Sequence, residues 1–431
     1  MVNEPQTPVV DASVLGDVDA WDLRRAGDWY RFHARLPGDQ GARMFRRRVA
    51  VPRDASAPDI IADPTGALYG VLSLGGARRA GTSDEALRFP YHVVTAGDEF
   101  GPAGSVGTEA PVATELMQRV WEQSRDTLLA DALVAQRFAD WRALPVIYAR
   151  GEADSSATMA EFTEGAAMAQ LAQTVANFVA AAGSLGLPPK VLCVGLDFVA
   201  EDVSGDAEAW RAGMIAVMDN VTALFARHGL RKPLFTTLFD AGSGTQPDGP
   251  VLRAQWELAW NCGAHDLLVT APGYMFAQDR FGRLTGDARA QLAEMEACAV
   301  EAANADAGWA CPLFLLAEVE GDGKTIRCKA QCTGPLVVDG DDPLGAGAAA
   351  GFRLEGTRNG ARVTGVTVAR DDPQDLLLTC DKPPKGRAVT LLYALGQDGG
   401  NRGAVRDGWA RASRTGATLR RWALPAALPV H

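Results

Sequence analysis

The stretch most informative about chemistry is a glycine-rich turn that follows an apolar run. The run covers residues 68–72, and the turn after it contains Gly75, Gly76 and Ala77. A strand that leads into such a turn is one way in which an enzyme exposes a nucleophilic hydroxyl at the end of a sheet. The position expected for that hydroxyl carries the methyl group of Ala77, which cannot attack an ester.

The elements that must position this turn alternate between strand and helix patterns from residue 65 to 309. Helical spacing of apolar residues follows Thr163, runs from Asp206 to a stop at Gly229, surrounds Trp256, and resumes at Thr285. This alternation predicts an α/β domain with a flavodoxin-like, doubly wound parallel sheet. The expected strands are 68–74, 144–149, 190–198, 233–239 and 266–271.

The loops after these strands are where function is expected. In open parallel sheets, ligands bind outside the carboxyl ends of the strands, so the loops after residues 74, 149, 198, 239 and 272 should share one rim. We call these segments the rim loops.

The flanking regions read as β-rich. Within residues 1–64, the segments 29–36 and 44–51 predict a hairpin, and Arg46 to Arg48 is interpreted as a solvated strand of it rather than an anion site. After residue 310 the apolar residues alternate with period two up to residue 431, which predicts a β-sandwich domain of about 110 residues.

The composition argues against several classes of binding partner. The net charge of −11 argues against nucleic acid and anionic membranes as partners. No apolar run is long enough to span a bilayer and no signal peptide is recognisable, so we expect cytoplasmic synthesis without membrane insertion. The seven cysteines show no metal-ligand spacing, so free thiols and no metal or cofactor are expected, with a Cys328–Cys332 redox pair as the alternative.

Four rim loops carry short motifs in a recognisable order. They are residues 75–81 with Ala77, 149–154 with Gly151, 194–198 with Leu196 and Asp197, and 279–285 with Asp279 and Arg283. In this order they resemble the conserved blocks of the SGNH (GDSL-like) hydrolases, most closely the branch around sialate O-acetylesterases and related phage-encoded proteins. The resemblance covers about residues 66–305. Thr108 to Pro111 is similar to an acidic helix start in that family, which implies a helix burying Leu116 and Val120.

The resemblance implies a degenerate catalytic site. Ala77 stands at the position of the nucleophile, Leu196 at that of an assisting polar residue, and Arg283 at that of the general-base histidine. Arginine stays protonated and cannot accept the proton of a serine. Gly151 stands where a backbone N–H normally helps to hold the oxyanion. Of the five histidines, only His92, or another carried on a long loop, is expected to be able to reach the rim.

Rim loops that have lost their catalytic residues are still suited to binding a ligand. Carboxylates and arginines there would hydrogen-bond sugar hydroxyls, and Tyr274 would stack on a sugar ring or pack in the core. Asp279 and Arg283 are also expected to form a structural ion pair, and Trp256 and Trp260 to face the core. The expected ligand-binding residues are Arg78, Gly151, Glu152, Asp197, Tyr274, Asp279 and Arg283.

The leading hypothesis is a non-catalytic carbohydrate-binding component of a phage-like particle, such as a spike or fibre that attaches to a surface polysaccharide. Its further partners would be other virion proteins and copies of itself. The virion part comes from the resemblance to phage-encoded relatives and not from composition. The alternatives are a structural virion adaptor, and an active carbohydrate O-acetylesterase with a rearranged site that uses His92.

Overall fold

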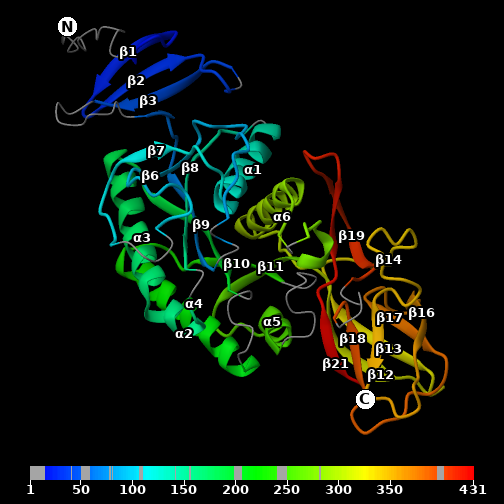
Figure 1. The fold of residues 1–431 in the computed structure, drawn as a ribbon. Helices are drawn as coiled ribbons and strands as arrows, with labels where there is room; N and C mark the ends of the chain where they lie inside the picture. Colours follow the sequence, from blue (N-terminus) through cyan, green and yellow to red (C-terminus); the bar gives the residue numbers. More distant parts are fainter. Residues whose placement is uncertain are drawn as a thin grey trace.

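The structure is a computed structural model, and its three parts follow one another along the molecule (Figure 1). An antiparallel sheet formed by the N-terminal residues sits at one end, an α/β domain occupies the centre, and a β-rich domain forms the other end. The structure describes residues 15–39, 41–49, 59–76, 79, 81–105, 110–140, 142–154, 157–198, 206–239, 250–280, 283–395 and 402–431.

The central sheet has seven strands in the order β11-β10-β9-β5-β8-β6-β7. All neighbouring pairs are parallel except β6 and β7, which are antiparallel. The five predicted strands are present, whereas the sequence analysis missed β6 and β7 at one edge. The strands are β5 (Leu68–Gly75), β6 (Val93–Ala96), β7 (Met117–Arg119), β8 (Val146–Ala153), β9 (Pro189–Asp197), β10 (Leu234–Phe239) and β11 (Asp266–Pro272).

Helices cover both faces of this sheet, as a doubly wound fold requires. One face packs against α1 (Arg125–Ala139) and α6 (Gly286–Asn304), and the other against α3 (Ala166–Ser184) and α4 (Ala207–Arg227). The shorter helices α2 (Met159–Glu164) and α5 (Pro250–Trp260) contact α4.

Side-chain caps set where several of these helices begin. The predicted helix starts at Asp206 and Thr285 are confirmed, because both side chains accept a backbone N–H of the first turn. Thr163 does not cap a helix. It lies inside α2, which starts after a capping box at Thr158, and α3 begins after Gly165.

The helix expected after Thr108 is not formed by the described residues 110–120. Residues 117–119 pair with β6 as strand β7, and Leu116 is 40% exposed rather than buried. Leu116 and Val120 have helical spacing, but pairing with the edge of the sheet outweighs that local pattern. The helix of this region is α1, which starts nine residues after Leu116 and is capped by Ser124.

The N-terminal sheet packs at the end of the α/β domain opposite the rim loops (Figure 1). Its strands β2 and β3 form the expected hairpin, and the indole N–H of Trp29 donates to the carbonyl of Ser184 at the end of α3, at 2.9 Å. Arg46 pairs with Asp63 and Arg48 with Glu115, so these arginines are structural. The strands are β1 (Ala20–Ala26), β2 (Trp29–Ala34), β3 (Arg43–Arg48) and β4 (Ile60–Ala62).

The C-terminal region is all-β, as the period-two pattern predicts. Its strands form three antiparallel sheets around one core, in which the rings of Phe314, Phe352 and Tyr393 contact one another. The strands are β12 (Leu313–Val319), β13 (Thr325–Gln331), β14 (Leu336–Val338), β15 (Phe352–Glu355), β16 (Val363–Val368), β17 (Asp375–Cys380), β18 (Thr390–Tyr393), β19 (Val405–Ala412), β20 (Thr418–Trp422) and β21 (Ala426–Pro429).

The cysteines are free thiols, most of them buried. Cys328 and Cys332 are both free, so no disulfide joins them in this structure. Burial raises the pKa of the Cys328 thiol, and the Cys332 thiol donates to the carbonyl of Gly334 at 3.0 Å. Among the described residues, no helix is both long and apolar enough to cross a membrane. The described part of the chain also contains no group of three or more potential metal ligands.

Candidate functional site

The central strands end level with one another and form the expected rim. Gly75 at the end of β5 lies in register with Ala153 of β8 on one side and Asp197 of β9 on the other. Phe239 of β10 is likewise level with Pro272 of β11. The sheet therefore brings the first three motifs together, with Gly151, Glu152 and Asp197 near one another beneath the rim. Ala77 and Arg78 lie outside the described residues.

The space beneath the rim contains a buried ion pair. The Arg79 guanidinium donates to Asp126 Oδ1 at 2.6 Å, and the Ser73 hydroxyl donates to Asp126 Oδ2 at 2.7 Å. Side-chain exposure is only 1% for Arg79 and 0% for Asp126. Ser73 is also fully buried and its partner is a carboxylate rather than a histidine, so its hydroxyl is not positioned as an attacking group.

A second arginine connects α1, α6 and β9 at the rim end of the sheet. Arg125 in the first turn of α1 donates two hydrogen bonds to Glu296 of α6, at 2.8 and 2.7 Å, and one to Asp197 of β9, at 2.8 Å. Burial alone would lower the pKa of Arg125, but the carboxylates of Glu296 and Asp197 outweigh burial and raise it. Asp197 is therefore occupied by an internal partner.

A third arginine forms an ion pair with Glu152. Arg150 donates to Glu152 Oε1 at 2.8 Å and to both carboxylate oxygens of Asp98 at 2.9 Å. The hydroxyl of Thr174 donates to the same Oε1 at 2.7 Å, and Glu152 is fully buried. Glu152 is thus part of the interior rather than a surface group that reaches a sugar. We refer to Arg79, Arg125 and Arg150 with their carboxylate partners as the buried charge network.

Glycines of the motifs make room for this network. A Cβ atom at Gly195 would lie 1.9 Å from Nη2 of Arg79. One at Gly151 would lie 2.7 Å from Oδ2 of Asp126 and 2.8 Å from the Ser73 hydroxyl. Real Cβ atoms do not approach other atoms so closely. These glycines therefore have a packing role that does not depend on any catalysis.

The backbone N–H expected to hold an oxyanion, that of Gly151, is already bonded, as is the N–H of Gly76 in the first motif. The N–H of Gly151 donates to the carbonyl of Pro102 at 2.9 Å, and that of Gly76 donates to the carbonyl of Asp197 at 3.0 Å. An oxyanion hole needs N–H groups that point to the position of the developing charge. Contrary to the expectation from the motif, Gly151 does not offer such a donor in this structure.

No histidine lies at the rim. All five are among the described residues, and His92 precedes β6 at the amino end of the sheet, where its carbonyl accepts the N–H of Ile147. Ala153 at the rim lies six residues further along β8, which corresponds to about 20 Å. His92 is 4% exposed, its Nδ1 lies 2.9 Å from the carbonyl of Pro145, and burial lowers its pKa. The expectation that His92 reaches the rim is contradicted.

Two described residues of the last motif, Asp279 and Arg283, are exposed and contact each other. The N–H of Arg283 donates to Asp279 Oδ1 at 2.9 Å, and the charged groups of the two residues lie 4.0 Å apart. Their side chains are 76% and 42% exposed for Arg283 and Asp279, so both are accessible to a ligand. Arg289 at the start of α6 donates to the carbonyl of Thr82 at 3.3 Å, which places this motif next to the segment that follows the first glycine-rich turn.

The remaining predicted positions are interior. Leu196 is fully buried in β9. Tyr274 follows β11 but is only 6% exposed, because it packs against the C-terminal domain. Its hydroxyl donates there to the carbonyl of Ala423 at 2.5 Å. Trp256 donates its indole N–H to the carbonyl of Phe314 at 2.9 Å, in the same interface. The structure therefore places Tyr274 in the core between two domains and not on an open sugar-stacking surface.

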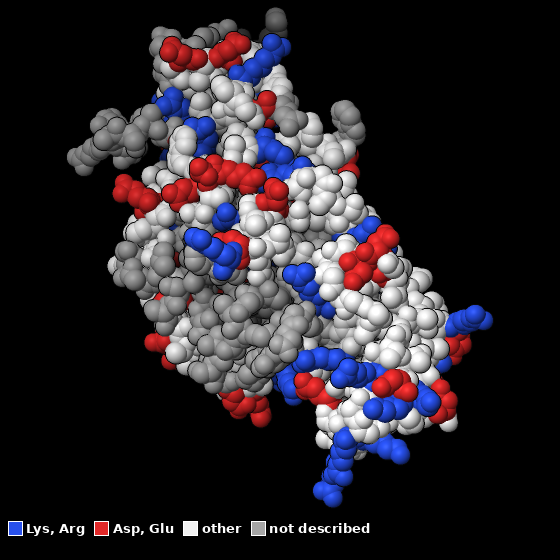
Figure 2. All heavy atoms as spheres, turned by 45° about the vertical axis from the view of Figure 1, so that its right-hand side comes forward, with Lys and Arg blue, Asp and Glu red and all other residues white. Residues whose placement is uncertain are grey.

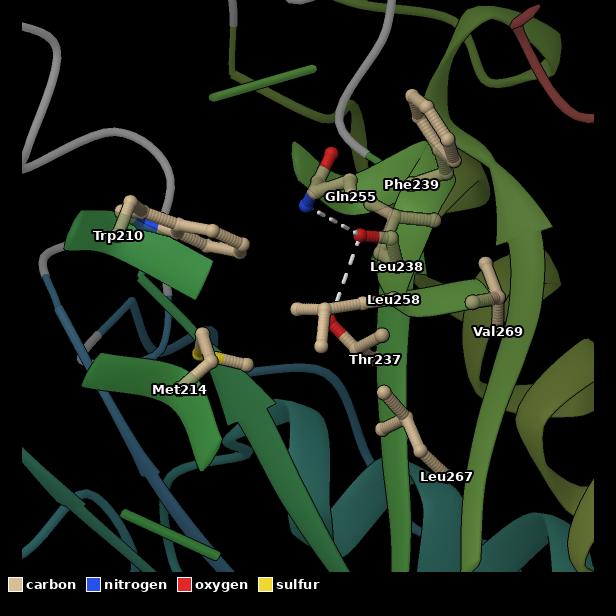
Figure 3. A pocket seen from close by; sticks show the side chains of 9 residues that line it. All are labelled: Trp210, Met214, Thr237, Leu238, Phe239, Gln255, Leu258, Leu267 and Val269. Atoms are coloured by element: carbon tan, nitrogen blue, oxygen red, sulfur yellow. Dashed lines mark hydrogen bonds between the residues drawn. The ribbon is translucent and has the colours of Figure 1, made fainter. Parts of the chain in front are cut away.

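A small cavity lies beside the carboxyl end of β10 (Figure 3). Trp210 of α4, Leu258 of α5 and Leu267 of β11 contribute to its walls, and Gln255 donates to the carbonyl of Leu238 at 3.3 Å. The indole N–H of Trp210 has no hydrogen-bond partner among the described residues. The cavity volume of about 10 Å³ corresponds to one water molecule, so it is too small to hold a sugar.

The buried charge network is the part of the site that sequence reasoning missed. In the sequence, Arg79 is only a member of the first motif, and no pattern predicts a role for Arg125 or Asp126. One signal was available, because the pair Arg125-Asp126 directly follows Ser124, a residue type that caps helices.

Comparisons with known proteins support the fold alone. No family model and no curated protein matches the chain. The crystal structure of a carbohydrate acetylesterase from Xanthomonas citri is similar with a TM-score of 0.53 and 14% identity, covering 94% of this chain and 85% of that chain. A protein from Arabidopsis thaliana is similar with a TM-score of 0.38 and 15% identity, covering 54% of this chain and 98% of that chain. The first similarity shows a hydrolase-like fold.

Proposed function

We propose that this chain is a non-catalytic carbohydrate-binding protein built on a hydrolase-like α/β fold. The proposal rests on the absence of catalytic groups among the described residues at and beneath the rim loops. The interior beneath these loops is filled by the buried charge network, the candidate oxyanion donor Gly151 is bonded, and every histidine lies elsewhere. Acyl transfer of the serine–histidine type needs a nucleophile, a base and an oxyanion hole together.

The exposed part of the rim supports a binding role. Asp279 and Arg283 present a carboxylate and a guanidinium to solvent at the end of the sheet where α/β folds bind ligands. Such groups hydrogen-bond the hydroxyl pairs of sugars without needing to activate them. The fold likeness to a carbohydrate acetylesterase supports carbohydrate as the ligand class.

The proposal predicts that the chain does not hydrolyse esters. With p-nitrophenyl acetate or acetylated xylan, we expect no release above the buffer rate for the wild type and for the Ala77→Ser variant. Restoring the hydroxyl alone is not expected to help, because Arg283 cannot accept its proton and none of the five histidines lies at the rim. Release of acetate that disappears when one serine is replaced, with Ser155→Ala and Ser156→Ala after Gly151 as the first variants to test, would establish the acetylesterase alternative.

Glycan binding is the direct test. On a glycan array, we expect specific binding by the wild type and a loss on the order of tenfold for the Asp279→Ala/Arg283→Ala variant, equivalent to about 1.4 kcal/mol. The matched control is Arg142→Ala/Glu301→Ala, which removes another exposed ion pair, one at the C-terminal ends of α1 and α6. Absence of specific binding to any glycan would refute the proposal and favour a structural adaptor.

Attachment to a phage-like particle, as a spike or fibre with other virion proteins and as a homo-oligomer, stays a prediction. It rests on the resemblance of the rim motifs to those of phage-encoded proteins. The proposal of carbohydrate binding does not depend on it.

A further inference from the structure

Two loops of the C-terminal domain lie side by side and form one surface. They are residues 356–362 and 382–388, which we call the basic loop surface. The N–H of Arg358 donates to the carbonyl of Lys385 at 2.7 Å, and the side-chain amide of Asn359 donates to the carbonyl of Pro383 at 2.8 Å. A Cβ atom at Gly386 would lie 2.3 Å from the carbonyl oxygen of Gly356, so the two backbones touch.

This surface concentrates positive charge on an acidic protein. The whole chain carries a net charge of −11, yet Lys and Arg side chains gather at the end of the molecule formed by the C-terminal domain (Figure 2). No ion pair involves the cations of the basic loop surface within the described part of the chain. These cations are Arg358, Arg362, Lys382, Lys385 and Arg387.

Two carboxylates border these loops in the sequence, and both have partners: Glu355 pairs with Arg353, and Asp381 is bound by the backbone. Asp381 accepts the N–H of Arg362 at 2.8 Å, and this hydrogen bond lowers the pKa of the carboxyl group. Asp381 therefore stays ionised near neutral pH, and five cations lie beside two bordering carboxylates, Asp381 and Glu355. The surface keeps a net positive charge that is held in place by hydrogen bonds between the loops.

The chemistry of the loops favours one class of polyanion. Residues 356–362 and 382–388 contain no aromatic side chain and no large apolar side chain. Single-stranded nucleic acids are normally held by aromatic stacking, and membrane surfaces by apolar side chains that insert beside the cations. A chain of sugars with carboxylate groups needs neither, because guanidinium groups bind carboxylates through paired hydrogen bonds.

We propose that the basic loop surface binds an acidic polysaccharide through the carboxylates of its uronic acid units. This inference rests on the proposed carbohydrate-binding function and adds the class of glycan and a second contact surface. The surface belongs to a different domain from Asp279 and Arg283. One long polysaccharide that engages both places would be held more tightly than by either alone.

The test measures binding of a decagalacturonate to the full chain. We expect the wild type to bind, and the variant Arg358→Gln/Lys385→Gln/Arg387→Gln to bind on the order of tenfold more weakly. The control Arg24→Gln/Arg227→Gln/Arg231→Gln changes the net charge equally at exposed positions outside the surface, and its affinity should stay within about twofold. Wild-type affinity should fall as salt is raised.

Several results would overturn the inference. The first is unchanged decagalacturonate binding by the basic-surface variant, and the second is an equal loss in the charge-matched control. The third is wild-type binding to duplex DNA, but not to decagalacturonate, that the basic-surface variant loses. A wild type that binds neutral glycans on the array but no uronate contradicts only this inference. A wild type that binds no glycan contradicts the proposed function as well.

Discussion

Replacing Arg125 with methionine is expected to lower the free energy of unfolding by about 3–5 kcal/mol. The arginine side chain is only 10% exposed and bonds to Glu296 and Asp197, which are 0% and 5% exposed. Methionine fills a similar volume but leaves two buried carboxylates without their cation. Burying an uncompensated charge costs far more than an exposed ion pair contributes.

Two further variants separate this effect from a general effect of charge. Arg142→Met removes a partner of Glu301 at 2.7 Å, but the Arg142 side chain is 51% exposed, so the loss should stay below about 1 kcal/mol. Arg125→Lys keeps the charge but lacks the planar fork that reaches both carboxylates, and we expect an intermediate loss. Urea denaturation followed by circular dichroism measures all three. Equal losses for Arg125→Met and Arg142→Met would contradict the assignment of a buried network.

The second large effect is expected for Gly195→Ala, which should lower the free energy of unfolding by about 3 kcal/mol. The added methyl would lie 1.9 Å from Nη2 of Arg79. The Arg79 side chain is only 1% exposed, so it cannot move away from the methyl group without breaking its ion pair with Asp126. The substitution therefore overpacks the interior and also displaces a buried ion pair.

A double-mutant cycle tests this cause. In an Arg79→Ala background the methyl has room, so Gly195→Ala should cost about 1–3 kcal/mol less than in the wild type. The control is Gly183→Ala in α3, where a Cβ atom meets nothing within 4 Å and alanine stabilises a helix by about 1 kcal/mol. Equal costs of Gly195→Ala in both backgrounds would show that Arg79 is not what the glycine accommodates.

Much of the central fold was predictable because strands and helices leave local patterns. The apolar segments of β5, β8, β9, β10 and β11 were recognised to within a few residues at each end. Edge strands were not, because β6 and β7 have only four and three residues. Such short segments do not show a periodicity that differs from helical spacing.

The candidate site was predictable only in part. Sequence order brought Gly151 and Asp197 to the same end of the sheet, where both lie near the ends of strands that pair with β5. Sequence order could not show that Tyr274 would be covered, since its partner Ala423 lies 149 residues further along the chain. It also could not show that His92 lies at the opposite end of the sheet from the rim.

By itself, the sequence determined the alternation of strands and helices, the all-β pattern of the C-terminal region, and the identities of Ala77 and Arg283. These depend on residue type and on spacing over a few positions. Only the tertiary structure decided which polar groups remain accessible. The ion pairs of Arg79 and Arg125 join residues 47 and up to 171 positions apart, and only the packing of α1 and α6 against the sheet places those charges in one interior.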